Sequence, residues 1–321
     1  MPISTSSGAS ARSSGTDPDV SGGPIVGIDV GGTKILAVAI EPDRPGTPLV
    51  EHWAPTPTDA DDVLDAIVEC ARAVGVDRRL GVGLAGLVGA DGVLRAAPNL
   101  RCMVGVPVVG PLTAALAVDP PVVDNDANCA LRAELAIGAA SGVDDVVLVT
   151  LGTGIGGAVA MDGRVRPGAH GFAGEPGHML VDPDGPPCPC GRRGCWERYA
   201  SGAGLAALAA AAGMAGLRGE DVVNLVRDGD AAACAVLDRF AWWVACGLAS
   251  IADLLDPALL VIGGGLSATA DLWLDAVCTS FVEQTLGGRD RRTRIEVART
   301  GPAAGAIGAA LRVLEAAGPE W

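Results

Sequence analysis

Two stretches of the chain repeat one pattern, in which an apolar run, a glycine-rich turn and a second apolar run follow one another. Residues 25–30 and 35–40 flank Gly31-Gly32-Thr33-Lys34, and residues 146–151 lead through the glycine-rich segment 152–157 into 158–161. Apolar runs joined by such turns are typical of β-hairpins. Thr150 in the second pattern takes the place of Asp29 in the first. The repeat predicts a duplicated α/β unit whose two turns face one cleft.

The remaining pattern places further elements around these hairpins. Apolar strands are predicted at 80–88, 121–123 and 258–262, and helices at 124–136, from about Ser267 and from Pro302. We expect a smaller domain from residues 24–122 rejoined by the C-terminal helix 302–321, and a larger domain from 123–301. The first 23 residues are small, polar and low in complexity, which predicts a disordered tail.

Composition indicates a globular protein. The chain has 321 residues, of which 49% are hydrophobic, enough for a packed core. The apolar run 205–217 is interrupted by Gly213 and is shorter than the roughly 18 to 20 residues of a membrane span. The N-terminus has no apolar signal-peptide core, so we expect no membrane association and a cytoplasmic location in which cysteines stay reduced.

The net charge of −15 argues against a nucleic-acid surface, because no run of lysine or arginine offsets it. If the protein binds an anion such as ATP, the attraction must come from backbone N–H groups, helix N-termini and Mg²⁺.

The glycine turns are suited to phosphate. Glycine allows positive φ and close backbone approach, and consecutive N–H groups then form an anion site. Residues 152–157 match G-x-G-x-x-G, but a strand follows where a dinucleotide fingerprint opens a helix, and Lys34 follows Thr33 where a Walker A loop needs the reverse order. Two ordinary hairpin turns are the alternative. Asp29, beside the first turn, is placed to organise Mg²⁺.

A third glycine cluster, residues 263–265, follows a predicted strand and precedes a predicted helix. Such a turn suits a flat adenine or a ribose against the backbone, and a plain strand-to-helix turn fits equally well. The nucleotide-binding residues predicted from the three turns are Asp29, Gly31, Gly32, Thr33, Lys34, Gly152, Thr153, Gly154, Gly264 and Gly265.

Asp124-Asn125-Asp126-Ala127-Asn128 opens a predicted helix at the probable domain junction. Helix capping explains one of these polar residues but not four within five positions. Asp126 at a helix N-terminus should stay ionised and can accept a proton from an attacking alcohol, so we predict that it is the catalytic base.

The segment EPGHMLVDPDGPPCPCGRRGCWE, residues 175–197, contains His178, Cys188, Cys190 and Cys195. A Cys₃His set suits tetrahedral zinc, and four protein ligands leave no position for a catalytic water, so the predicted zinc is structural. The alternatives are reduced thiols or, less favoured because the spacing is C-x-C, a redox dithiol.

This segment, with EPGH at its start and CWERYASG at its end, resembles the signature of the ROK family of sugar kinases, chiefly glucokinases, and sugar-responsive repressors. The resemblance runs from about Ile25 to about Ala310. It implies an actin-like ATPase (ribonuclease H-like) fold, transfer of the γ-phosphoryl of MgATP to O6 of glucose, and a homo-oligomer, either dimer or tetramer. The sugar-binding residues that it implies are Asn99, Asn125, Asp126, Glu175, His178 and Glu197.

Two residues depart from the family pattern. Asp124 stands where these proteins usually carry Glu, and Pro176 replaces a larger apolar residue. Either change is expected to shift the loop that bears Glu175 and so to alter sugar preference. An N-acetylmannosamine kinase is the alternative within the family, although the Tyr-Ala-Ser-Gly ending of 199–202 resembles glucokinases. A repressor would need an N-terminal DNA-binding domain, for which 23 residues are too few.

Overall fold

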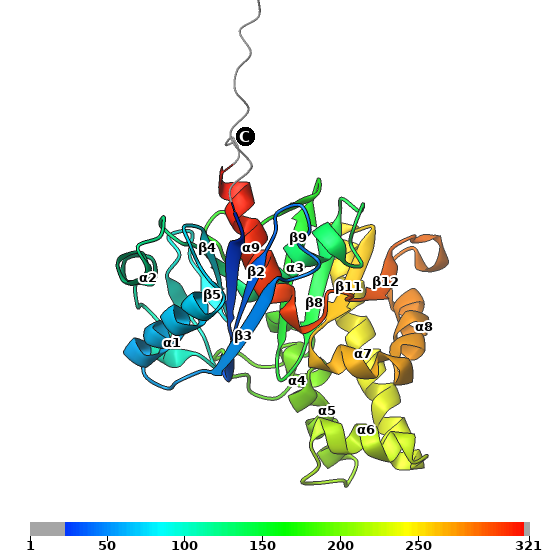
Figure 1. Ribbon diagram of the computed structural model, residues 1–321. Helices are drawn as coiled ribbons and strands as arrows, with labels where there is room; N and C mark the ends of the chain where they lie inside the picture. Colours follow the sequence, from blue (N-terminus) through cyan, green and yellow to red (C-terminus); the bar gives the residue numbers. More distant parts are fainter. Residues whose placement is uncertain (1–22, 318–321) are drawn as a thin grey trace, which may run out of the picture.

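The computed structural model describes residues 23–317, so the predicted disordered tail lies almost entirely outside the described residues. These residues form two halves, each built on a five-stranded sheet (Figure 1). The first sheet has the order β3-β2-β1-β4-β7. Its strands are β1 (Ile25–Val30), β2 (Lys34–Ile40), β3 (Val50–Pro55), β4 (Leu80–Leu84) and β7 (Val122–Asn125).

The second sheet has the corresponding order β10-β9-β8-β11-β12. Its strands are β8 (Val146–Leu151), β9 (Ile155–Met161), β10 (Arg164–Val165), β11 (Leu259–Gly263) and β12 (Arg294–Val297). In each sheet the first strand pairs antiparallel with its hairpin partner and parallel with the next strand inward. The shared topology confirms the duplication predicted from the two hairpins. A separate pair, β5 (Leu87–Val88) and β6 (Leu94–Ala96), lies beside the first sheet.

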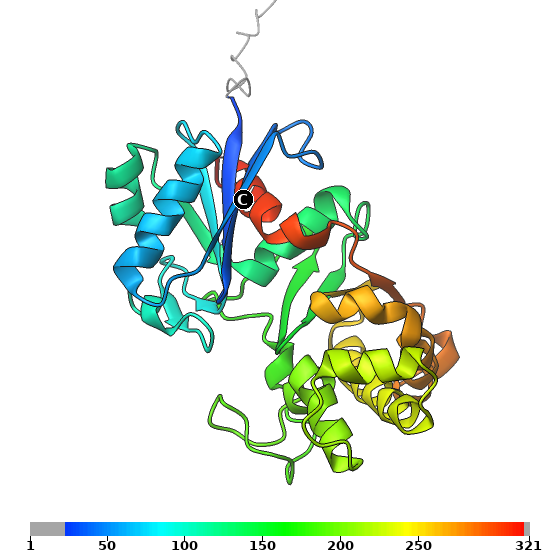
Figure 2. The ribbon, with the colours of Figure 1, turned by 60° about the horizontal axis from the view of Figure 1, so that its bottom comes forward.

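Helices cover both faces of each sheet. They are α1 (Ala60–Ala73), α2 (Val109–Leu116), α3 (Asp126–Ile137), α4 (Glu197–Ala200), α5 (Gly202–Ala211), α6 (Gly219–Arg227), α7 (Ala231–Leu255), α8 (Leu274–Gln284) and α9 (Ala304–Ala317). The helices α1 and α2 pack on the outer face of the first sheet, and α5 to α8 on the outer face of the second. Figure 2 shows these two layers on opposite sides of the molecule.

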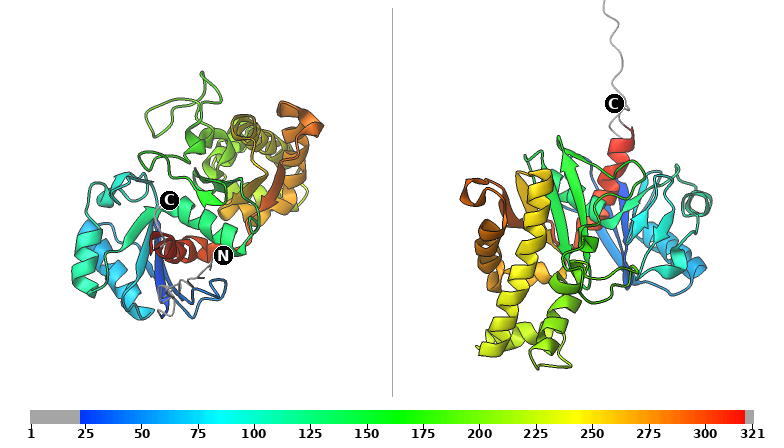
Figure 3. Two further views of the ribbon diagram at one scale, coloured as in Figure 1. Left: turned by 90° about the horizontal axis from the view of Figure 1, so that it is seen from above. Right: turned by 180° about the vertical axis from the view of Figure 1, so that it is seen from behind.

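The helices α3 and α9 lie side by side between the two sheets (Figure 3). On α3, Leu131 joins the core of the second sheet, whereas Ala133 packs with α9 and β2 of the first. The C-terminal helix therefore packs on the first sheet. Because α3 contributes to both cores, its first residue lies where the two halves meet.

The helix α7 is, in the described part of the chain, the one helix long and apolar enough to cross a membrane by length and composition. Of its most apolar window, 61% is buried inside the protein, which is typical of a core helix.

Several element boundaries differ from the predictions. The predicted strand 80–88 breaks at Gly86, whose φ is +137° and whose substitution would bring a Cβ 2.4 Å from the carbonyl oxygen of Ala96. The strand β7 extends through Asn125, so α3 begins at Asp126 with Asn125 as its cap. After β11 a 3₁₀ segment, Gly265–Leu272, replaces the predicted helix, and α9 begins at Ala304 rather than at Pro302.

Candidate functional site

Two predicted carboxylates meet in one cavity between the halves. Asp29 lies near the end of β1, and Asp126 is the first residue of α3. Both line a cavity of about 600 Å³, which we call the carboxylate cavity, together with Thr150, Gly264 and Gly265. The predicted metal-organising residue and the predicted base therefore share a space with the third glycine cluster.

Burial sets the electrostatics of these carboxylates. It raises the pKa of Asp29 to about 7, with a further contribution from Asp126 and an opposing one from Lys34. Burial also raises the pKa of Asp126 to about 6, although the N–H of Ala127 opposes the rise. We expected the helix dipole to dominate at Asp126, but removal from water outweighs it. The carboxyl group is still mostly ionised at pH 7.

Glu175 adds to this negative charge. Burial, and then Asp126 and Glu197, raise its pKa to about 7. Carboxylates crowded in this way favour the binding of a cation, or of a ligand with several hydrogen-bond donors, because either relieves their repulsion.

Hydrogen bonds within the loop before α3 orient Asp126. Its Oδ1 accepts from the N–H of Ala127 at 2.9 Å and from Nδ2 of Asn125 at 3.0 Å. The Asn125 amide also donates to the carbonyl of Gly86 and accepts from the N–H of Asn128. Both ends of this amide are therefore engaged within the protein, so Asn125 orients the predicted base in addition to any contact with sugar.

Of the two predicted reasons for glycine at the hairpin tips, positive φ is wrong. None of Gly31, Gly32, Gly152 and Gly154 has φ in the left-handed region. Close approach decides instead at two of them. A Cβ on Gly32 would lie 2.6 Å from Cβ of Asn99, and a Cβ on Gly154 would lie 2.4 Å from Oε2 of Glu197.

The tip of the second hairpin is held by the segment that follows the cysteine cluster. Glu197 accepts a hydrogen bond on Oε2 from the N–H of Ile155 at 2.8 Å, and Gly202 donates to the carbonyl of Gly152 at 2.8 Å. The two glycines at 156 and 157 lie within β9 and not at the tip. A Cβ on Gly157 would lie 2.7 Å from Cγ of Pro176, so the loop that bears Glu175 packs directly on this strand.

The four predicted metal ligands come together. The ligand atoms of His178, Cys188, Cys190 and Cys195 all lie within 4.8 Å of one another. The sulfurs of Cys190 and Cys195 are 3.6 Å apart, close to the roughly 3.8 Å expected between two thiolates at about 2.3 Å from a tetrahedral zinc. The donor set and its geometry fit structural zinc.

A second cavity, of about 770 Å³, was not predicted from the sequence. It is lined by Gly152, Thr153, Gly265 and, on α6, by Glu220, Asn224 and Arg227. We call it the α6 cavity. The spacing of the three α6 residues places them on one helix face, a signal that the sequence carries but that is common on exposed helices. Beside the cavity Gly264 has φ of +80°, and a Cβ there would lie 2.5 Å from the carbonyl oxygen of Leu151.

The first hairpin tip and Asn99 are predicted site residues that lie near the two cavities without lining them. Thr33 and Lys34 are exposed, and the tip Gly31–Lys34 lines neither of these two cavities, although Lys34 is close enough to lower the pKa of Asp29. Asn99 is also exposed and lies against this tip.

The two residues that depart from the family pattern have different neighbours. The carboxylate of Asp124 contacts Arg132 of α3 and Arg312 of α9, whereas Pro176 lies against β9. Their expected effect on sugar preference stays a prediction.

Two sheets of identical strand order, with hairpin tips and carboxylates gathered where the halves meet, define the actin-like ATPase fold. The sequence model of the ROK family matches residues 25–316. The chain belongs to the ROK family.

Individual relatives are similar over nearly the whole chain. A glucokinase of Streptomyces coelicolor is 35% identical over 310 residues, which is 90% of this chain and 96% of that protein. An N-acetyl-D-glucosamine kinase of Salmonella paratyphi C is 34% identical over 303 residues, 88% of this chain and 97% of that one. The structure of a ROK glucokinase from Streptomyces griseus in complex with glucose and AMPPNP is 35% identical, with a TM-score of 0.79 and coverage of 91% and 100%.

Proposed function

We propose that this protein is an ATP-dependent glucokinase, which transfers the γ-phosphoryl of MgATP to O6 of glucose. The observation that carries the proposal is Asp126 at the start of α3, oriented by Asn125 and lining a cavity with Asp29. The similarity to glucokinases over 90% of the chain supports the same reaction.

Asp126 takes the proton from the attacking hydroxyl. A pKa of about 6 leaves it unprotonated at neutral pH but still basic enough to receive that proton as the bond to phosphorus forms. Phosphoryl transfer requires little covalent chemistry from the protein, so the other residues act by placing and neutralising the reactants.

The sugar is held by polar groups around Asp126. Glu175, Glu197, Asn99 and His178 offer acceptors and donors to its hydroxyls, and a wrong epimer would leave some of these groups unpaired. Glu197 keeps its bond to Ile155 while its other oxygen faces the sugar.

The nucleotide lies between the hairpin tips and α6. The N–H groups and hydroxyls of residues 31–34 and 152–154 contact the phosphates. The adenosine occupies the α6 cavity beside Gly264 and Gly265. Asp29 would hold Mg²⁺, which neutralises charge on the phosphates, and His178, Cys188, Cys190 and Cys195 would hold a zinc ion that maintains the loop.

Closure of the two domains excludes water that would otherwise accept the phosphoryl group. We take residues 24–122 with the C-terminal helix as the smaller domain and 123–301 as the larger. The two halves meet through the packed helices α3 and α9.

The experiment that tests the proposal is a coupled assay of the purified protein over a panel of sugars. The panel contains glucose, mannose, fructose, N-acetylglucosamine and N-acetylmannosamine, each with ATP and with polyphosphate as donor. We expect the highest kcat/KM for glucose with ATP, because an acetamide in place of a hydroxyl adds bulk and leaves a carboxylate acceptor unpaired. A preference for an acetamido sugar would contradict the glucokinase assignment and leave a sugar kinase. No phosphorylation of any sugar would contradict the kinase itself.

A further inference from the structure

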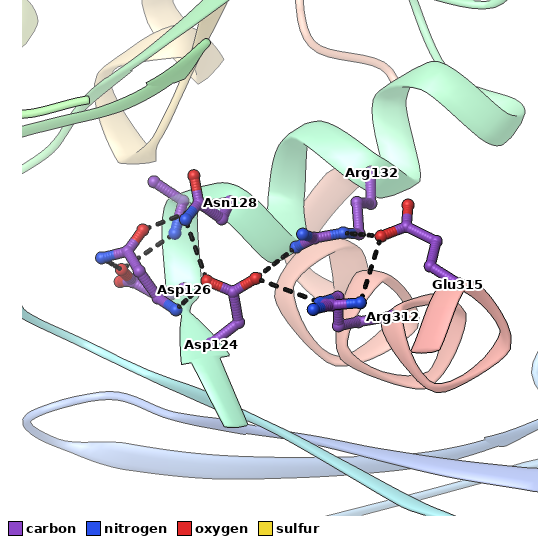
Figure 4. A network of polar contacts seen from close by, with 8 residues as sticks. Asp124, Asp126, Asn128, Arg132, Arg312 and Glu315 are labelled. Carbon is purple, nitrogen blue, oxygen red and sulfur yellow. Dashed lines mark hydrogen bonds and ion pairs between the residues drawn. The ribbon is translucent and has the colours of Figure 1, made fainter. Parts of the chain in front are cut away.

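A network of charges connects the C-terminal helix to the start of α3 (Figure 4), buried at Asp124 and Arg132 and partly exposed at Arg312 and Glu315. Oδ2 of Asp124 lies 2.8 Å from Nη1 of Arg132 and 3.7 Å from Nε of Arg312. Glu315 on α9 lies 2.8 Å from Nε of Arg132. The side chain of Arg132 is 4% exposed and that of Asp124 is 13% exposed. Removing one partner of a buried ion pair strongly destabilises a protein, because the other charge is then left buried and uncompensated.

The second oxygen of Asp124 acts on the loop that carries the proposed base. Oδ1 accepts from Nδ2 of Asn128 at 2.9 Å and from the backbone N–H of Asn125 at 2.7 Å. Asn125 in turn donates to Oδ1 of Asp126 at 3.0 Å. Two hydrogen bonds therefore separate Asp124 from the carboxylate of Asp126.

The two oxygens of Asp124 have different partners. One faces the arginines of α3 and α9, and the other faces the amides of the loop. A carboxylate serves both sets at once, because one oxygen accepts the hydrogen bonds of the loop while the other places negative charge against the arginines. An amide has one acceptor oxygen and would present N–H donors to an arginine.

We propose that Asp124 is a positioning residue, which holds Asn125 and Asn128 so that Asp126 keeps its place, and which transmits the position of α9 to the base. This inference rests on the proposed function, in which Asp126 is the base. It also gives Asp124 a role distinct from the sugar preference expected from the sequence.

The test compares Asp124→Ala, Asp124→Glu and wild type in steady-state kinetics with glucose and ATP, at a temperature well below unfolding. Misplacing a base by about 1 Å costs on the order of 100-fold in rate. We expect kcat of Asp124→Ala to fall by about 10- to 100-fold, while KM for each substrate stays within a factor of about three. Asp124→Glu keeps two acceptor oxygens and should return kcat to within about fivefold of wild type.

Asp253→Ala is the matched control. Asp253 on α7 pairs with Arg291 at 2.9 Å, and Arg291 is 13% exposed. This ion pair is distant from the loop in the chain and has no role in the site. We expect a lower unfolding temperature and unchanged kcat. An equal loss of kcat in Asp124→Ala and Asp253→Ala would mean that the loss comes from general destabilisation of the fold, and it would overturn the proposal.

Asp124→Asn keeps the experiment decisive if the alanine variant does not fold. One amide oxygen cannot serve the arginines and the loop amides together, so kcat should fall by at least about threefold. Wild-type kcat in this variant, or failure of Asp124→Glu to exceed Asp124→Ala, would overturn the proposal. Asp126→Asn is measured in parallel. If Asp126→Asn keeps its kcat, the proposed base is wrong; if it loses kcat and Asp124→Ala does not, only the positioning role is wrong.

Discussion

The hairpin tips Gly31–Thr33 and Gly152–Gly154 occupy equivalent places in two sheets of the same strand order. The first tip is held by Thr56, whose hydroxyl donates to the carbonyl of Gly31 at 2.7 Å. The second is held by Glu197 and Gly202, which belong to the segment that follows the cysteine cluster. Close contact requires glycine at one position of each tip, Gly32 and Gly154. The two tips therefore have equivalent places in the fold and different neighbours.

The two hairpins differ most in the charge that they carry beside the tip. Asp29 in the first half corresponds to Thr150 in the second, and both line the carboxylate cavity. Duplication therefore preserved the geometry of two opposed hairpins, while only one copy carries a carboxylate at this position. Since Asp126 and Glu175 already crowd the cleft with negative charge, a second aspartate at 150 would raise the repulsion further.

Removing the base between the halves should have the largest effect. Asp126→Asn keeps the size of the side chain but cannot take a proton, so kcat should fall by at least about 100-fold, with only a modest change in glucose binding. Steady-state kinetics and calorimetric titration with glucose measure the two quantities. Asp162→Asn, at an 86% exposed side chain, is the control and should behave as wild type. Near-normal kcat in Asp126→Asn would show that another group acts as the base.

Substitution at each of the corresponding positions, Asp29 and Thr150, tests whether the two halves have different roles. Asp29→Asn should lower kcat by about 10-fold or more at limiting Mg²⁺, since a neutral amide is a poorer partner for the cation. Thr150→Val should cost no more than about threefold, the loss of one neutral hydrogen-bonding group. Kinetics over a Mg²⁺ titration distinguish them. Equal losses in both variants would mean that the halves are not specialised.

Filling the second tip should uncouple it from Glu197. In Gly154→Ala the new Cβ would lie 2.4 Å from Oε2 of Glu197, so that carboxylate must move and lose its bond to Ile155. We expect kcat/KM for glucose to fall by about 10-fold. Gly110→Ala in α2 has nothing within 4 Å of its Cβ and should instead stabilise the fold by roughly 0.5–1 kcal/mol. Unchanged kcat/KM in Gly154→Ala would remove the link between sugar residue and hairpin.

Loss of a cysteine tests whether metal maintains the segment behind the second tip. The wild-type protein should contain about one zinc per chain, and Cys190→Ser should lower zinc content, unfolding temperature and, by several-fold, activity. Elemental analysis and thermal unfolding measure these. Cys234→Ser, at a cysteine outside the cluster, should leave the zinc in place. A folded, metal-free protein with full activity would exclude structural zinc.

The smallest change is in pH dependence. The pKa of Asp126 lies at about 6, above the ordinary value of 3.8, so this carboxyl is protonated at a higher pH than most aspartates. The base form is lost as pH falls, and kcat should be half-maximal near pH 6 and level at higher pH, with neighbouring carboxyls contributing to the apparent value. A pH profile of kcat at saturating substrates measures it. A half-maximal value near pH 4 would mean that burial does not perturb this site.

Much of the site could be predicted because its signals are local. Each hairpin is a contiguous pattern of apolar runs and glycines, and the zinc ligands fall within residues 178–195, so the chain itself places them together. The duplication predicted that the two hairpins face one cleft, but the approach of Asp29 to Asp126, the first residue of α3, came from the tertiary structure. The boundaries were less accurate, because capping by Asn125 and the break at Gly86 depend on contacts across the fold.

The sequence by itself determined the fold class, the family, the two glycine tips and the cysteine cluster, since each is encoded in neighbouring residues. Only the tertiary structure decided which groups act on them. The bond from Glu197 to Ile155, the α6 wall of the second cavity and the pairing of Asp124 with Arg312 join segments distant in the chain. No local pattern encodes such contacts, because they arise when packing buries polar groups that must then find partners.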